Sequence, residues 1–342
     1  MIPKGETMLN PTRRSALLTG LAASTFTILP SISRAATVAR LASNLPSNHP
    51  MVIRLKEAAE AIKKDTNGEL EIRMFPSSQL GGDLEVLSQL RSGAIQFYPL
   101  AGAQLSTLVP VSSLSGVGFA FQNINDVWKA TDGEVGGLIR GAVADANLVV
   151  FDKMFDNGFR QVTTGSKPIE RPEDLKGLSI RVPPSPLSTS LFKAFGAAPQ
   201  SISFGEVYTA LQTKLVEAQE NPLGLIDSNK FYEVQKFVSM TSHMWDGFWT
   251  LSNKTFWNRL PQATRDIVIK RFDEAVLAER EDVAKLNDSL IQKLKGAGMT
   301  FVEPNRQGFR EALNNTSFYQ EWKGRFGAKA WETLERYTGK LG

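Results

Sequence analysis

Short β-branched and apolar runs alternate with amphipathic segments along most of this chain, and this alternation limits its fold more than any other feature. Strands and helices that alternate at this spacing are typical of a mostly parallel α/β sheet with helices on both faces. The alternation resumes after Arg160, so we expect a second α/β unit. In the first unit, the expected strands are residues 36–43, 69–75 and 94–101, and the expected helices begin after Pro50 and after Asp83, which is well placed as a cap.

The end of the chain has a different pattern. Apolar residues follow helical spacing from Ala263 to about Gly296, as at Phe272, Val276 and Leu290. This periodicity predicts one long amphipathic helix, or two joined helices, that ends at the glycine. A helix of this length suits a brace across two lobes, and packing within one lobe is the simpler alternative.

Residues 1–35 have the features of an export signal, which are a charged start, an apolar middle and a small-residue exit. The adjacent Arg13 and Arg14 resemble a twin-arginine signal, and an ordinary Sec signal is the alternative. We expect cleavage after Ala35 and a periplasmic mature protein. The apolar stretch is too short for a membrane span, so we expect no direct membrane insertion.

Composition excludes several classes of protein. The formal net charge is +4, but four basic residues and one acidic residue lie in the first 35 positions, so the remainder is nearly neutral. A nearly neutral body does not favour nucleic-acid binding. The chain has no cysteine, and its two histidines, His49 and His243, are too few for a histidine-rich metal site. We therefore expect no cofactor and no metal.

No catalytic motif stands out in the sequence. There is no nucleophile elbow, no phosphate loop and no dinucleotide fingerprint. A carboxylate pair that performs acid/base chemistry stays an open alternative. We nevertheless expect a protein that is not an enzyme.

The stretch LSIRVPP places Arg181 inside a short run that has the features of a buried strand. A guanidinium group stays charged, so a buried arginine needs an anion. That anion is either a carboxylate from outside, held by the arginine fork, or an acid of the protein such as Glu220 or Asp156. Arg160 and Asn221, which lie near turn signals, add groups suited to a carboxylate.

Several longer segments resemble the DctP-type substrate-binding proteins of TRAP (tripartite ATP-independent periplasmic) transporters. The central segments span Phe155–Ser185, Gly196–Pro222 and Asn229–Phe237, and the segment Phe75–Phe97 resembles the family's first-lobe signature. The resemblance implies a two-lobed periplasmic-binding-protein-like fold, with hinge strands and a long helix bracing both lobes. It also implies a solute-binding protein that delivers an organic acid to the membrane permease subunits of a TRAP transporter.

The same resemblance implies which residues bind the ligand. The arginine of IRVP holds the ligand carboxylate, with help from the arginine of NGFR and the asparagine of ENP. Asp83 also suits a helix cap. The ligand-binding residues that we expect are Arg181, Arg160, Asn221, Asn44, Asp83, Phe204, Phe155, Trp245 and Trp249.

Departures from the family pattern bear on the ligand. Relatives that bind sugar acids can carry a carboxylate where this chain has Ala101, whereas Trp245, Trp249 and Phe155 suit an apolar or aromatic ligand body. We therefore favour a monocarboxylate with such a body, for example a 2-hydroxy or 2-oxo acid. A C4-dicarboxylate, with its second carboxylate on Arg160, is the alternative. A ligand-binding component of a sensor and a secreted enzyme are rival classes.

For the domain organisation, we expect the export signal to be followed by two lobes, each built from separate parts of the chain. Lobe I comprises residues 36–157 and about 248–285, and lobe II comprises residues 158–247 and about 286–342.

Overall fold

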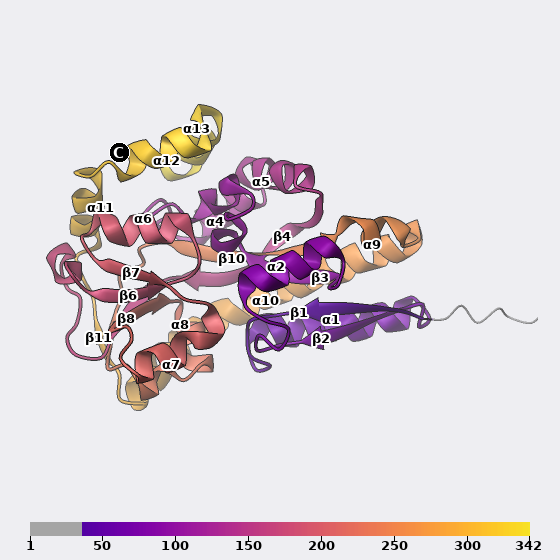
Figure 1. Cartoon of the computed structure of the whole chain (residues 1–342), viewed down its shortest axis with the longest axis horizontal. Helices are drawn as coiled ribbons and strands as arrows, with labels where there is room; N and C mark the ends of the chain where they lie inside the picture. The colour runs from indigo at the N-terminus through magenta and orange to yellow at the C-terminus, as the bar shows by residue number, and fades with distance from the viewer. Residues whose placement is uncertain (1–35) are drawn as a thin grey trace, which may run out of the picture. The chain divides into compact units, whose positions relative to one another are not determined.

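The computed structural model describes residues 36–342, except for the side chains of residues 287 and 288, and these residues form one compact unit. The expected export segment, residues 1–35, lies outside the described residues. Two mixed sheets flanked by helices make up the described part (Figure 1). The fold class that we expect from the sequence is therefore confirmed.

The first sheet combines parallel and antiparallel strands. In sheet order its strands are β2 (Leu70–Phe75), β1 (Thr37–Ala42), β3 (Phe97–Ala101), β10 (Trp245–Asn253) and β4 (Leu148–Phe159). β1 pairs in parallel with β2 and β3, whereas β10 runs antiparallel to both β3 and β4. The local alternation of strands and helices predicts the parallel strands β1, β2 and β3. The antiparallel strand β10 comes from a part of the chain more than 100 residues later.

Helices connect the strands of this sheet. They are α1 (Pro50–Asp65), α2 (Asp83–Ser92), α3 (Gly102–Leu105), the 3-10 helix η1 (Pro110–Gly116), α4 (Ile124–Thr131), α5 (Glu134–Asp145) and α9 (Lys254–Arg259). In α1, the side chain of His49 accepts the backbone N–H of Met51 as an N-cap, and Pro50 occupies the first turn. The buried side chains of α1, such as Leu55 and Ile62, recur at helical spacing and face the core.

The second sheet contains six short strands. In sheet order they are β11 (Thr300–Val302), β9 (Phe237–Ser239), β5 (Gln161–Thr164), β8 (Ala218–Asn221), β6 (Ser179–Val182) and β7 (Ala198–Ser201). Its helical segments are η2 (Pro172–Leu175), α6 (Pro186–Ala194), η3 (Phe204–Glu206), α7 (Val207–Gln212), α8 (Leu223–Ser228), η4 (Phe231–Glu233) and α11 (Arg306–Asn314). β6 is parallel to β7 and β8, and β5 is antiparallel to β8 and β9.

Two strand connections pass directly from one sheet to the other. β4 belongs to the first sheet and is followed, after Arg160 alone, by β5 of the second sheet. β9 returns from the second sheet to β10 of the first. The division into lobes I and II stays a prediction, and its boundaries at 157/158 and 247/248 fall inside β4 and β10, a few residues from these connections.

The long helix is confirmed as a single element, α10 (Gln262–Gly296). It contacts α1 and β4 near the first sheet and α8 near the second sheet. Asp282 of α10 pairs with Arg54 of α1 at 2.7 Å, and Lys293 pairs with Asp227 of α8 at 2.7 Å. α10 therefore braces elements of both sheets.

Two helices at the end of the chain, α12 (Phe318–Phe326) and α13 (Ala328–Thr338), return toward earlier parts of the structure. α12 contacts α6 and η1, whereas α13 contacts α4, α5 and η1 (Figure 1). The hydroxyl of Tyr319 donates to the carbonyl of Gly118 at 2.9 Å. α13 thus packs on helices of the segment that we expect in lobe I, although residues 286–342 are expected in lobe II.

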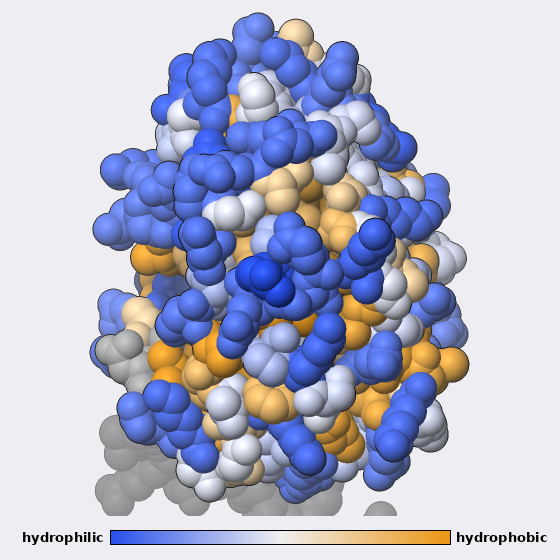
Figure 2. Space-filling view, turned by 90° about the vertical axis from the view of Figure 1, so that its left-hand side faces the viewer, coloured by the Kyte–Doolittle hydropathy of each residue, from blue (hydrophilic) through white to orange (hydrophobic). Residues whose placement is uncertain are grey.

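Figure 2 shows the end of the molecule that carries the second sheet and α11. Hydrophilic residues cover most of this face, and apolar residues lie between them. Within residues 36–342, no helix combines the length and the apolar character needed to cross a membrane.

A core substitution in α10 tests how this helix packs on the first sheet. Phe272 is fully buried, and its ring lies edge-on at 5.5 Å from the ring of Phe97 and 5.1 Å from that of Phe151. We expect Phe272→Ala to lower the free energy of unfolding by about 3–5 kcal/mol, because it removes ring contacts and leaves a cavity. Urea unfolding followed by circular dichroism measures the change.

Leu277 provides the matched control on the same helix, since its side chain is 48% exposed. Leu277→Ala should change the free energy of unfolding by less than about 1 kcal/mol. Equal losses in the two variants would contradict a stabilising contribution of the buried ring to packing on the first sheet.

Candidate functional site

Arg181 lies in β6 and is almost completely buried, with 1% of its surface exposed. Its Nε donates to the carbonyl of Ile202 at 2.9 Å, and its guanidinium carbon lies 5.9 Å from the ring centre of Phe204. One terminal nitrogen is buried without a hydrogen-bond partner among the described residues. Burial lowers the pKa of Arg181 to about 10, although the nearby charges of Glu220 and Asp83 oppose this effect. The arginine therefore has an unused donor that suits an anion.

The sequence leaves open whether an acid of the protein pairs with Arg181, and the structure excludes both candidates within its described residues. Glu220 receives hydrogen bonds from Arg160 and lies 3.1 Å from Nε2 of His243. Asp156 accepts the indole N–H of Trp245 at 3.0 Å. Neither carboxylate forms an ion pair with Arg181 in residues 36–342, so its free nitrogen stays available.

Asp83 and Asn44 form a second polar group beside the first sheet. Nδ2 of Asn44 donates to Oδ1 of Asp83 at 2.7 Å, and the hydroxyl of Tyr98 donates to the same oxygen at 2.9 Å. Oδ2 of Asp83 and Oδ1 of Asn44 are buried and lack partners in the described part of the chain. These two acceptors would suit a ligand that donates hydrogen bonds.

The interpretation of Asp83 as a helix cap is wrong. The N-cap of α2 is Gly82, which has no side chain to accept a hydrogen bond, and Asp83 is the first residue of the helix. The Asp83 carboxylate is instead held by Asn44 and Tyr98. The carboxylate of Asp83 therefore does not cap α2, and its Oδ2 has no hydrogen-bond partner in the described residues.

The loop before α2 closely approaches the segment around η3. The first segment leads to Asp83, and the second carries Phe204, which lies beside Arg181. A Cβ atom added to Gly82 would lie 3.0 Å from Oγ of Ser203, and one added to Gly205 would lie 3.3 Å from Oγ of Ser78. The negative charge of Asp83 also raises the pKa of Arg181. The loop before α2, which leads to Asp83, thus contacts the segment that carries Phe204, the neighbour of Arg181, and joint binding of one molecule by Asp83 and Arg181 stays a prediction.

Arg160 is also buried, but its donors are already in use. The guanidinium forms two hydrogen bonds with the carboxylate of Glu220, pairs with Asp246 at 3.1 Å and donates to Oδ1 of Asn221 at 3.0 Å. Burial by itself raises the pKa of Glu220, but Arg160 and His243 outweigh it and lower that pKa to about 2. Arg160 thus fixes the position of Asn221, and its direct contact with a ligand stays a prediction.

Asn221 and Phe204 lie beside these arginines. Nδ2 of Asn221 donates to Oε1 of Gln219 at 2.5 Å, so the amide is held at both ends. The ring of Phe204 lies 6.3 Å from that of Phe231, in addition to its contact with Arg181. Both residues are nearly fully buried.

The aromatic residues of the paired strands β4 and β10 pack into the two cores. Phe155 and Trp249 are completely buried. The ring of Trp245 lies edge-on at 5.4 Å from that of Trp128, and its indole N–H is bound by Asp156. These rings have neighbours of their own, so the contact with a ligand that we expect from the sequence stays a prediction.

Two polar residues that the sequence did not single out come from β3 and from α3, which follows the carboxyl end of β3. Tyr98 holds Asp83, and Gln104 of α3 has a buried Oε1 without a partner in residues 36–342. Ligands of α/β sheets bind beyond the carboxyl ends of the strands. The position of Gln104 three residues after β3 is the signal that could have revealed it.

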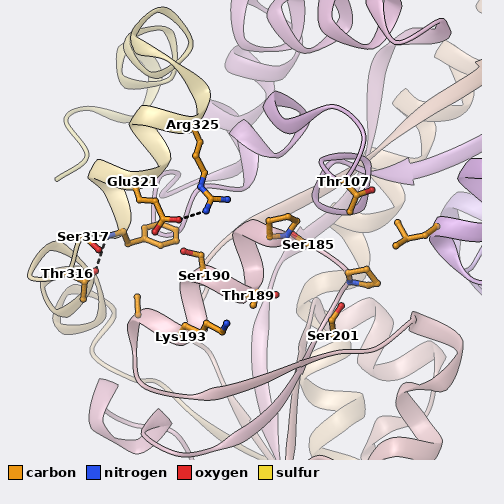
Figure 3. A pocket seen from close by; sticks show the side chains of 15 residues that line it. Thr107, Ser185, Thr189, Ser190, Lys193, Ser201, Thr316, Ser317, Glu321 and Arg325 are labelled. Atoms are coloured by element: carbon orange, nitrogen blue, oxygen red, sulfur yellow. Dashed lines mark hydrogen bonds and ion pairs between the residues drawn. The ribbon is translucent and has the colours of Figure 1, made fainter.

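A pocket of about 720 Å³ lies next to this site, and Figure 3 shows it. Thr107 comes from the first sheet's connections, Ser185 and Lys193 come from α6, and the ion pair between Glu321 and Arg325, at 2.7 Å, comes from α12. Hydroxyl side chains predominate in the lining. Among residues 36–342, no group of three or more metal-ligating side chains is placed to hold an ion.

The buried carboxyl group of Asp156 should make the free energy of unfolding depend on pH. Burial raises the pKa of this carboxyl group to about 6, well above its ordinary value near 4. A raised folded-state pKa for an acid means that stability is lost as pH rises from about 4 to about 6, because the folded state must then hold a buried charge. We expect Asp156→Asn to remove up to about 3 kcal/mol of this fall, since each pKa unit corresponds to about 1.4 kcal/mol.

Urea unfolding of both proteins between pH 4 and pH 7 measures this effect as a difference of slopes, in which titrating groups that are not coupled to Asp156 cancel. The buried Glu279, whose pKa is raised by burial and by the charge of Asp156, contributes to the same difference. Asp152→Asn is the control, because that side chain is 74% exposed. Parallel curves for the wild type and Asp156→Asn would show that Asp156 is not the responsible group.

Comparison with known proteins identifies relatives of this chain. The family model "Bacterial extracellular solute-binding protein, family 7" (DctP) matches residues 41–323. The 2,3-diketo-L-gulonate-binding periplasmic protein YiaO of Escherichia coli (strain K12) is 34% identical over 264 residues, which cover 77% of this chain and 80% of the relative.

Solved structures agree with this match. A TRAP periplasmic solute binding protein from Polaromonas sp. JS666, bound to D-erythronate, has a TM-score of 0.84 and 26% identity, and the match covers 90% of this chain and 99% of that one. A TRAP periplasmic solute binding protein from Sulfurospirillum deleyianum DSM 6946, with bound succinate, has a TM-score of 0.83 and 26% identity, with coverage of 89% and 99%.

Proposed function

This chain belongs to the DctP family of bacterial extracellular solute-binding proteins of TRAP transporters, and we propose that its ligand is a hydroxylated monocarboxylate. The observation that carries the proposal is the pairing of one unused donor on Arg181 with two unused acceptors on Asp83 and Asn44. A carboxylate suits the arginine, and hydroxyl groups suit the two acceptors. The ligand would then bridge elements of both sheets.

The unused acceptors argue against a second carboxylate at this place. A carboxylate has only acceptor atoms at neutral pH, so Oδ2 of Asp83 would repel it. Arg160, the residue expected to hold a second carboxylate, already binds Glu220 and Asp246. A C4-dicarboxylate therefore receives no support from these side chains.

An apolar or aromatic ligand body receives less support than the sequence suggests. Trp245, Trp249 and Phe155 pack into the cores, and two polar groups lie opposite Arg181. The ligands named for two relatives, 2,3-diketo-L-gulonate and D-erythronate, are monocarboxylates that carry hydroxyl groups. A 2-hydroxy acid with further hydroxyl groups thus fits better than an aromatic one.

Binding would act through closure. A ligand that contacts Arg181 on one side and Asp83 on the other stabilises the arrangement in which both contact it. In that arrangement Gly82 lies against Ser203, as in the structure described here. The closed protein would then deliver the acid to the membrane subunits of the transporter.

The place of action is part of the proposal. The E. coli relative is named as a periplasmic protein. We infer that this chain is exported to the periplasm and loses residues 1–35, after Ala35. N-terminal sequencing of the exported protein would identify the cleavage site.

The main experiment is isothermal titration calorimetry with D-erythronate, succinate and 3-phenyllactate. We expect binding of D-erythronate and at least a hundredfold loss of affinity in Arg181→Ala, because the lost contact is buried and charge-assisted. Arg73→Ala is the matched control, since that arginine forms a surface ion pair with Glu71 and does not line the pocket beside the site. Unchanged affinity in Arg181→Ala would contradict the assigned anchor.

A second variant tests the hydroxyl contacts separately from the carboxylate. Asp83→Ala removes an acceptor for ligand hydroxyls, so we expect it to weaken D-erythronate by about tenfold or more and to leave butyrate, which lacks hydroxyl groups, nearly unaffected. Calorimetry with both acids measures the difference. Tighter binding of succinate, or of 3-phenyllactate with its single hydroxyl group, than of D-erythronate by the wild type would reject a ligand with several hydroxyl groups.

A further inference from the structure

A second pocket lies away from the proposed carboxylate site, among α1, α8 and α10. Its volume is about 570 Å³, which is within the range of small-molecule sites. None of Arg181, Asp83 and Asn44 lines it. Part of its wall is apolar and accessible, because Ile53 is 42% exposed and Leu286 is 39% exposed.

His49 supplies a hydrogen-bond donor to this pocket. Its Nδ1 accepts the backbone N–H of Met51 at 3.3 Å, which places the proton of a neutral ring on Nε2. Burial lowers the pKa of His49 to about 4, so the ring is neutral at pH 7. Nε2 lies 4.0 Å from the position that a Cβ of Gly224 would occupy, so the glycine leaves room beside this nitrogen.

Two buried acceptors line the same pocket. Nδ2 of Asn157 donates to Asp246 at 3.4 Å, but its Oδ1 has no partner in the described part of the chain. Oδ2 of Asp227 pairs with Lys293, and its Oδ1 is likewise without a partner. Buried acceptors without partners cost free energy, so a donor that enters this pocket gains by satisfying them.

The charged residues of the lining already have partners of opposite sign. Asp282 pairs with Arg54, and Asp227 pairs with Lys293 at 2.7 Å. Lys285 lies 3.6 Å from Glu281. A charged ligand is therefore not needed to balance the charges of this pocket.

We propose that this pocket binds a small uncharged alcohol, with its hydroxyl group on His49 and Asn157 or Asp227 and its hydrocarbon body between Ile53 and Leu286. A hydroxyl is a neutral group that accepts from the imidazole N–H and donates to an amide or carboxylate oxygen at the same time. The apolar wall removes the hydrocarbon body from water.

Occupancy of this pocket would assist capture of the carboxylate, and this part of the inference rests on the proposed function. The walls come from α1, beside the first sheet, and from α8, beside the second, so an occupant favours the same arrangement as the bridging acid. Asn157 also donates to Asp246, which pairs with Arg160, and Arg160 donates to Asn221. A continuous set of polar contacts thus joins the pocket to Asn221, one of the residues expected to bind the acid.

The test uses cyclohexanol and its methyl ether, methoxycyclohexane, as probes in ligand-observed NMR titrations of the purified chain. The ether accepts a hydrogen bond but cannot donate one, so we expect it to bind at least about tenfold more weakly. Ser289→Trp places a large ring at the exposed rim of the pocket and should abolish binding. Ala284→Trp is the matched control, since Ala284 is exposed on the same helix and does not line the pocket.

Binding of cyclohexanol to the wild type and Ala284→Trp, with loss in Ser289→Trp, would support the site. No binding to the wild type, equal binding of the ether, or undiminished binding in Ser289→Trp would each overturn it. D-erythronate affinity is then measured with and without saturating cyclohexanol, and an unchanged affinity would refute the coupling. A protein that binds cyclohexanol as described but no organic acid would refute the proposed function alone.

Discussion

The buried ion pairs of Arg160 hold together the region on which the rest of the structure depends. Arg160 is the single residue between β4 and β5, Glu220 lies in β8, and Asp246 lies in β10. β4, β5 and β10 flank the two connections that pass from one sheet to the other, which are β4 to β5 and β9 to β10. Because none of the three groups reaches water, removing one would leave a buried charge without a partner. The geometry of the crossing and the position of Asn221 are thus set together.

The two buried arginines differ in what surrounds them. Arg160 is enclosed by carboxylates of the protein, so its charge is balanced before any ligand arrives. Arg181 has a carbonyl and an aromatic ring as neighbours, and its charge is balanced only at a distance. An arginine that is paired with carboxylates of the protein, such as Arg160, stabilises the fold. An arginine without such a partner, such as Arg181, is suited to bind an anion. This difference is the reason for assigning the carboxylate to Arg181.

Local patterns in the sequence predict much of the fold and one part of the site. Helical spacing predicts α10 almost to the residue, and the proline after Val182 predicts the end of β6. The partners of Arg160 could not be predicted in this way, because they lie 60 and 86 positions away and meet it only through sheet pairing. The capping role expected for Asp83 is wrong for a local reason, since Gly82 takes the capping position. The unused oxygens are likewise visible only once tertiary neighbours are known.

The contact between the loop before α2 and η3 has a consequence for the free energy of closure. At both points of approach the partner of a serine is a glycine, Gly82 for Ser203 and Gly205 for Ser78. A glycine has no side chain whose rotamers must be fixed when the two surfaces meet. Closure at these points therefore orders few side chains, so more of the free energy of the bridging ligand is available to affinity.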